Sequence, residues 1–98
     1  MDKTMNINDL LEVAYTELKS IKESTDNKYI IKCCDIITIK LIDIEDRKFQ
    51  QLDSVKYSID SIIYDITNMK GVLEQPEEYY TKLDTLHSVV SEIPDKYM

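Results

Sequence analysis

The chain has 98 residues, 43% of them hydrophobic, and a formal net charge of −7. Its length suits one small domain, and no apolar run approaches the roughly 18 residues of a transmembrane helix, so a membrane protein is not expected. Its acidity disfavours direct binding to nucleic acid or to anionic lipid, because both repel a negatively charged protein, and it favours a partner with a basic surface.

Glycine and proline are scarce, with one Gly and two Pro in the whole sequence. Arrays of β-hairpins need such residues in their turns, so helices with short polar connections are the better interpretation. The N-terminal residues show no apolar stretch behind a basic start, so we expect no secretory signal and a cytoplasmic location. Cys33 and Cys34 fit neither a disulfide framework nor a zinc pattern, and we interpret them as small buried hydrophobes.

The first predicted helix covers residues 6–23. Asn6 can cap its N-terminus, and Asp9 follows three residues later, where an acidic side chain is favourable. Apolar residues then recur at alternating spacings of four and three, which places them on one face of a helix. These residues are Ile7, Leu11, Ala14, Leu18 and Ile21.

The second predicted helix covers residues 26–46, with Asp26 or Asn27 as its cap. Its regular apolar face consists of Ile30, Cys34, Ile37, Leu41 and Ile44. Further apolar residues occupy the rest of the helix, among them Ile31, Ile36, Ile39 and Ile42. A helix that is apolar nearly all round is either the most buried member of a bundle or one face of a homodimer, here through these four isoleucines. Because the segment is rich in β-branched residues, a strand over residues 29–44 is the alternative.

The connection between the second and third helices admits two interpretations. Residues 45–51 are polar but include no Gly or Pro that would enforce a turn. A turn here gives a compact bundle, whereas an uninterrupted helix gives a long central rod that must dimerise to bury its apolar face.

The third predicted helix covers residues 49–70 and has the most regular apolar series in the chain, spaced alternately by three and four. The series consists of Leu52, Val55, Ile59, Ile62, Ile66, Met69 and Leu73. Gly71 is expected to end the helix in the left-handed conformation, in which case Leu73 falls outside it.

The fourth predicted helix covers residues 76–93. Pro76, Glu77 and Glu78 suit its first turn. Its apolar face consists of Tyr79, Leu83, Leu86, Val90 and Ile93. Pro94 is expected to end the helix and to leave residues 95–98 as a frayed tail.

These patterns predict an all-α protein, a small antiparallel four-helix bundle with residues 1–98 as a single domain. The alternative is a helical hairpin with a long central helix, forming a homodimer.

No catalytic signature accompanies these helices, so we expect a non-enzymatic protein without cofactor or metal. Asp84 and the single histidine, His87, are three residues apart and could share a proton or a metal, but no nucleophile or further ligand converges on them in the sequence. A boundary histidine half covered by neighbouring helices is the simpler interpretation.

The candidate partner-binding residues lie opposite the apolar face of the third helix. Tyr57 and Tyr64 are expected to point away from that face, and Asp53 and Asp60 flank them. Tyr80 in the fourth helix is a further candidate, because Tyr79 and Tyr80 are consecutive and cannot both face inward. Tyrosine combines a large apolar contact area with a polar tip and is enriched at protein interfaces. The alternative is that a neighbouring helix covers these tyrosines.

Taken together, the residues favour a protein–protein interaction module that binds a larger, basic partner and inhibits or sequesters it. Small acidic helical bundles of this kind include bacteriocin immunity proteins, antitoxins and phage inhibitors of host defence, a comparison of architecture and composition alone. The scarcity of Ala and Arg beside abundant Ile and Lys favours an A/T-rich bacterial, phage, plasmid or viral source. A nucleic-acid-mimicking acidic stripe is a variant of this hypothesis, and a self-associating structural protein is the alternative function.

Overall fold

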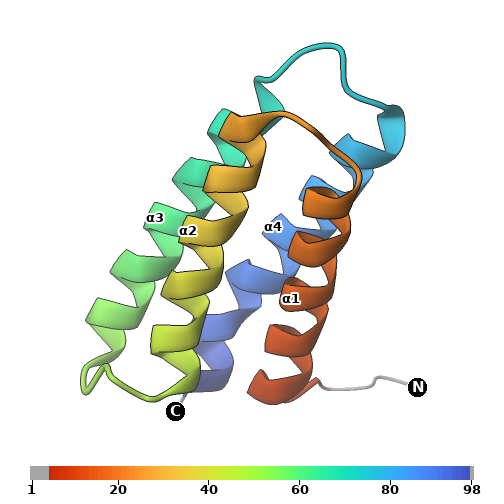
Figure 1. Ribbon diagram of the computed structural model, residues 1–98. Coiled ribbons are helices and arrows are strands. Elements are labelled where there is room, and N and C mark those ends of the chain that lie inside the picture. The colour runs from red at the N-terminus through yellow and green to blue at the C-terminus, as the bar shows by residue number, and fades with distance from the viewer. Residues whose placement is uncertain (1–4, 98) are drawn as a thin grey trace.

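A computed structural model describes residues 5–97, which form four α-helices and contain no strand (Figure 1). The helices are α1 (Ile7–Glu23), α2 (Lys28–Glu45), α3 (Leu52–Lys70) and α4 (Glu77–Tyr97). This confirms the predicted all-α fold. Residues 29–44, for which a strand was the alternative, lie entirely within α2.

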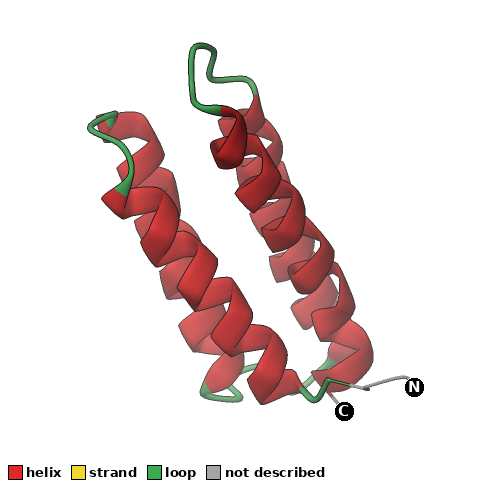
Figure 2. Ribbon diagram, turned by 90° about the vertical axis from the view of Figure 1, so that its right-hand side faces the viewer, coloured by secondary structure: helices red, strands yellow, loops and turns green. Residues whose placement is uncertain are grey.

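The four helices form an antiparallel bundle of two hairpins. The α1–α2 hairpin lies against the α3–α4 hairpin (Figure 2), and each helix contacts the helix before it and the helix after it, with α4 closing the ring against α1. The smallest dimension of the backbone is 18 Å, which fits two layers of helices packed about 10 Å apart. The bundle is therefore compact, as the first of the two predicted architectures requires.

The chain reverses direction between α2 and α3, so the alternative with one long central helix is wrong. Arg47 adopts a left-handed conformation with φ of 56°, and its guanidinium lies 4.8 Å from the ring centroid of Tyr97 and donates a hydrogen bond to the Tyr97 carbonyl. This contact with the end of α4 holds the turn, and it joins residues 50 positions apart in the sequence. No local signal such as Gly or Pro marks it.

The core consists of the apolar faces that the spacing predicts. All of the members predicted for α1, α2 and α4 are buried, as are those of α3 except Leu52, which is half-buried, and Leu73, which lies outside the helix and is 78% exposed. Four further buried residues extend these faces: Leu10, Cys33, Val89 and Tyr97. Among residues 5–97 the only polar groups brought inside belong to tyrosines, so the interior is held mainly by apolar packing.

The first two helices begin at the predicted caps. Asn6 and Asp9 form a reciprocal capping box, in which each side chain accepts a hydrogen bond from the backbone N–H of the other. At α2 the cap is Asn27, whose Oδ1 accepts from the N–H groups of Tyr29 and Ile30. Both caps satisfy N–H groups that have no partner within the helix.

Gly71 ends α3 but not in the predicted left-handed conformation. Its φ is −76°, and its N–H donates to the carbonyl of Asn68 in a tightened last turn. The left-handed residue of this loop is Glu74, with φ of 66°. A Cβ at Gly71 would lie 3.3 Å from the Asn68 oxygen, so the absence of a side chain relieves crowding there.

The prediction that Pro94 ends α4 is also wrong, because the helix continues through Pro94 to Tyr97. Proline cannot donate the usual backbone hydrogen bond and costs about 3 kcal/mol inside a helix. The last turn is held by Tyr97, which is 6% exposed and whose hydroxyl donates to the Phe49 carbonyl at 2.7 Å. Residues 95–97 are therefore not a frayed tail, and Met98 lies outside the described residues.

Candidate functional site

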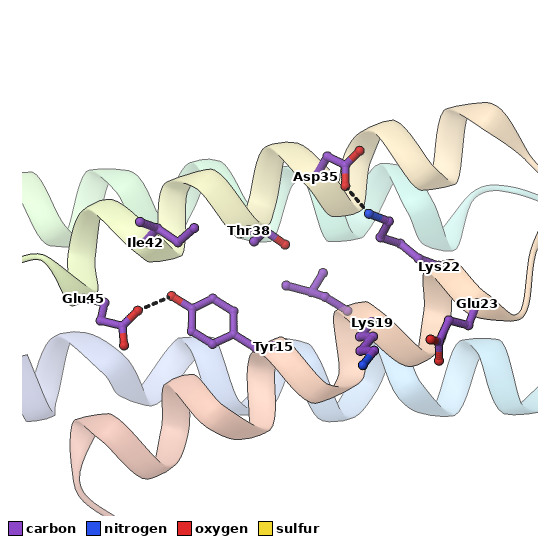
Figure 3. A pocket seen from close by; sticks show the side chains of 9 residues that line it. Tyr15, Lys19, Lys22, Glu23, Asp35, Thr38, Ile42 and Glu45 are labelled. Carbon is purple, nitrogen blue, oxygen red and sulfur yellow. Dashed lines mark hydrogen bonds and ion pairs between the residues drawn. The ribbon is translucent and has the colours of Figure 1, made fainter.

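Two surface grooves flank α2, one on each side. The groove between α1 and α2 has a volume of about 640 Å³ and is seen in Figure 3, where Thr38 and Ile42 line it from α2 and Tyr15 and Lys19 line it from α1. Its volume is in the range of small-ligand pockets. Sequence periodicity does not reveal it, because a groove depends on the sizes of side chains on two facing helices.

The polar groups at the two ends of this groove are paired with one another. Tyr15 donates a hydrogen bond to Glu45 at 3.0 Å, and Lys22 lies 2.5 Å from Asp35, as the dashed lines in Figure 3 show. Burial raises the pKa of Tyr15, and the hydrogen bond to Glu45 raises it further. Each pair joins α1 to α2. These two pairs therefore serve the α1–α2 contact, and the raised pKa of Tyr15 keeps its hydroxyl protonated at neutral pH.

The second groove lies between α2 and α3 and has a volume of about 510 Å³. Three small residues of α3, Ser54, Ser58 and Ser61, leave this space open beside α2. Lys40 of α2 crosses the groove, where its ammonium donates to Ser61 at 2.7 Å and to Asp65 at 2.9 Å. Other lining residues are Phe49, Asp53 and Tyr57. The groove thus includes Tyr57, one of the predicted partner-binding tyrosines.

Both predicted tyrosines of α3 are exposed. Tyr57 is 78% exposed and Tyr64 is 68% exposed, and no other helix of the bundle covers them. Asp53 and Asp60 are exposed beside them, and neither carboxylate forms an ion pair within residues 5–97. These four residues form the tyrosine surface. Its two rings are seven residues, or about 10 Å, apart along the helix.

The seven tyrosines of the chain divide into two groups. Four of them use their hydroxyls to hold the bundle together and donate to groups of other elements: Tyr15, Tyr79, Tyr80 and Tyr97. Tyr29, Tyr57 and Tyr64 are the exposed members. The hydroxyls of Tyr57 and Tyr64 form no hydrogen bond to another described residue, whereas a hydrogen bond with Cys33 raises the pKa of Tyr29. The exposed tyrosines lie on α2 and α3, two adjacent helices that belong to different hairpins.

Tyr80 differs from the other predicted partner-binding residues. It is half-buried, its hydroxyl donates to the Val72 carbonyl at 2.6 Å, and its ring packs edge-on against Tyr79 at a centroid distance of 5.0 Å. Tyr79 faces inward and donates to the Met69 carbonyl. The pair joins α4 to the end of α3, and Tyr80 is not part of the tyrosine surface.

Three isoleucines of α2 are exposed. Ile39 is 61% exposed, Ile42 is 41% exposed and Ile36 is 37% exposed, whereas Ile31 is half-buried. Of the four helices, α2 packs least extensively against its neighbours. The most apolar helix is therefore not the most enclosed one.

The other reactive groups that the sequence singles out are Asp84, His87, Cys33 and Cys34. Asp84 forms an ion pair with Lys70 at 2.7 Å, and no hydrogen bond joins it to the half-buried His87. Cys33 and Cys34 are buried and free, and burial raises the pKa of Cys34 to about 12, so its reactive thiolate form is scarce at neutral pH.

Within residues 5–97, no helix is long and apolar enough to span a membrane, and no three His, Cys, Asp or Glu side chains gather as metal ligands. Comparisons with protein-family models, curated proteins and solved structures find no match for this chain.

Proposed function

We propose that this protein is a non-enzymatic binding module whose tyrosine surface, Asp53, Tyr57, Asp60 and Tyr64, docks on a larger protein with a basic surface. The observation that carries the proposal is the exposure of Tyr57 and Tyr64 together with their unused hydroxyls. Four other tyrosines are tied into the fold, so packing accounts for those and not for these two.

The chemistry of the surface defines the partner. Tyrosine rings supply apolar contact and attract cationic side chains to their faces, and the two unpaired aspartates provide acceptors for arginine or lysine. A net charge of −7 adds long-range attraction to a basic patch and speeds association. Occlusion of that patch would inhibit or sequester the partner, in the manner of a phage, plasmid or viral accessory protein. Two free, adjacent cysteines fit a reducing cytoplasm.

The test uses a double variant, Tyr57→Ser with Tyr64→Ser, immobilised beside the wild-type protein in lysates of candidate hosts. We expect a basic protein to be retained by the wild type and lost with the variant. With the purified partner, calorimetry should show affinity lowered about 30-fold or more, because exposed tyrosines that become buried at an interface are typical hot spots. The fold should be unchanged, since both side chains are mostly exposed.

A matched control carries two substitutions of exposed residues on α1, Thr16→Ser with Lys19→Ser. This control should bind as the wild type does. If the tyrosine double variant retains the same partner with the same affinity, the tyrosine surface is not the binding site and the proposal is wrong.

A further inference from the structure

The outward side of α2 carries a second regular series, which is separate from the face it turns to the core. Lys32, Ile36, Ile39 and Asp43 are spaced by four, three and four residues, so they form one stripe along the helix. Ile36 and Ile39 are 37% and 61% exposed, Lys32 is exposed, and the Asp43 side chain is 38% exposed. This stripe has the spacing of a coiled-coil seam but no partner within the bundle.

The spacing of the four seam residues is the same from either end of the helix, but their charges are not. Its spacing is palindromic, and its centre lies between Ile36 and Ile39. A basic residue stands at one end and an acidic residue at the other. When two such helices lie antiparallel about that centre, Ile36 faces Ile39 of the second copy, and Lys32 faces Asp43 of the second copy. The parallel arrangement would set like charges against each other, which is unfavourable.

We propose that α2 is the interface of an antiparallel homodimer, in which the Lys32, Ile36, Ile39 and Asp43 seams of two copies pack across a two-fold axis. A two-fold interface must be complementary to itself, and the reversed order of charges along this seam meets that condition. The two isoleucines of each copy bury apolar surface at the centre, and two symmetry-related ion pairs fix the direction. This association is independent of the tyrosine surface on α3.

Neighbouring side chains are compatible with this arrangement. Asp43 also lies 3.0 Å from Lys48, but both groups are partly exposed, and such surface pairs are weak enough for Asp43 to accept a second cation. Ile42 turns toward the groove between α1 and α2, and Ile31 is half-buried, so both lie outside the seam. The seam spans about 16 Å of helix, and a contact of this length belongs to the weak class of interfaces.

Analytical ultracentrifugation of charge variants tests the proposal. The wild-type protein should sediment as a single chain of 11.5 kDa at low concentration and approach twice that mass as the concentration rises from about 10 μM to about 1 mM. Lys32→Asp and Asp43→Lys should each weaken the association about tenfold or more, because each sets like charges against each other at both ends of the seam. The double variant, which carries both changes, should restore it. Ile39→Asp should remain a single chain throughout.

The design separates the seam from general charge effects. Lys32→Asp makes the protein more acidic and Asp43→Lys makes it less acidic, so a net-charge effect would move the two variants in opposite directions. Lys56→Asp, at an exposed position of α3, changes net charge as Lys32→Asp does and should associate as the wild type. Circular dichroism checks that each variant is folded. A wild type that stays a single chain up to about 1 mM, or a double variant that fails to regain association, would overturn the proposal.

Discussion

Replacement of Ile37 by alanine is expected to lower the free energy of unfolding by about 2–5 kcal/mol, because it removes a fully buried side chain and leaves a cavity. The same replacement at Ile39 is expected to change it by less than about 1 kcal/mol, because that side chain is 61% exposed. Both residues lie in α2 and undergo the same chemical change, so helix propensity and composition cancel between the two variants.

Urea unfolding followed by circular dichroism measures the difference directly. The two variants should share the wild-type slope and differ only in midpoint. Equal losses at Ile37 and Ile39 would show that α2 does not present one face to the core, and they would contradict both the bundle and the free outward seam. A larger loss at Ile39 would mean that the helix is rotated.

Replacement of Tyr97 by alanine is expected to cost about 3 kcal/mol, although the residue is next to the end of the chain. Its ring is buried and lies against the guanidinium of Arg47, and its hydroxyl donates to the Phe49 carbonyl. The substitution therefore loosens the end of α4 and the turn between α2 and α3 together. Tyr97→Phe keeps the ring and should cost about 1 kcal/mol for the lost hydrogen bond.

Tyr64→Ala provides the matched control for this change. It removes the same side chain from a position that is 68% exposed and should alter the free energy of unfolding by no more than about 0.5 kcal/mol. The same urea titration applies. If Tyr97→Ala is as mild as Tyr64→Ala, the helix after Pro94 contributes nothing to the fold and the sequence-based expectation of a frayed tail regains support.

The helical faces could be predicted from the sequence because they depend on a local property, the spacing of apolar residues along one helix. In α2 this spacing predicts that Ile37 is buried and leaves Ile39 off the core face. Composition alone cannot distinguish them, because both are isoleucines in a mostly apolar segment. The caps at Asn6 and Asn27 are equally local, because each side chain bonds an N–H two or three residues away.

The end of α4 could not be predicted in the same way. The helix continues past Pro94 because Tyr97 packs on Arg47 and Phe49, and these contacts join positions about 50 residues apart. A prediction from local sequence considers only the backbone hydrogen bond that proline cannot form, and it therefore ends the helix at Pro94. Gly71 shows the same limit, since the helix ends there with a negative φ and the left-handed residue comes later, at Glu74.

The candidate site was only partly accessible to sequence reasoning. Helical position predicts that Tyr57 and Tyr64 point away from the core face, but whether another helix covers them depends on the order of helices around the bundle. Tyr80 is predicted with them as a partner-binding residue, but its hydroxyl donates a hydrogen bond to the Val72 carbonyl within the bundle. The exposure of Ile36 and Ile39 on α2 likewise follows only from the packed arrangement.

The exposure of tyrosine rings to a soluble paramagnetic chelate, followed by NMR of each ring, tests the central claim most directly. The claim is that Tyr57 and Tyr64 are free for a partner while Tyr79 and Tyr97 belong to the core. We expect strong relaxation enhancement at Tyr57 and Tyr64 and little at Tyr79 and Tyr97, in line with their exposed fractions. Protection of Tyr57 and Tyr64 in dilute protein to the level of Tyr79 would contradict the account, because these rings would then be packed within the chain itself.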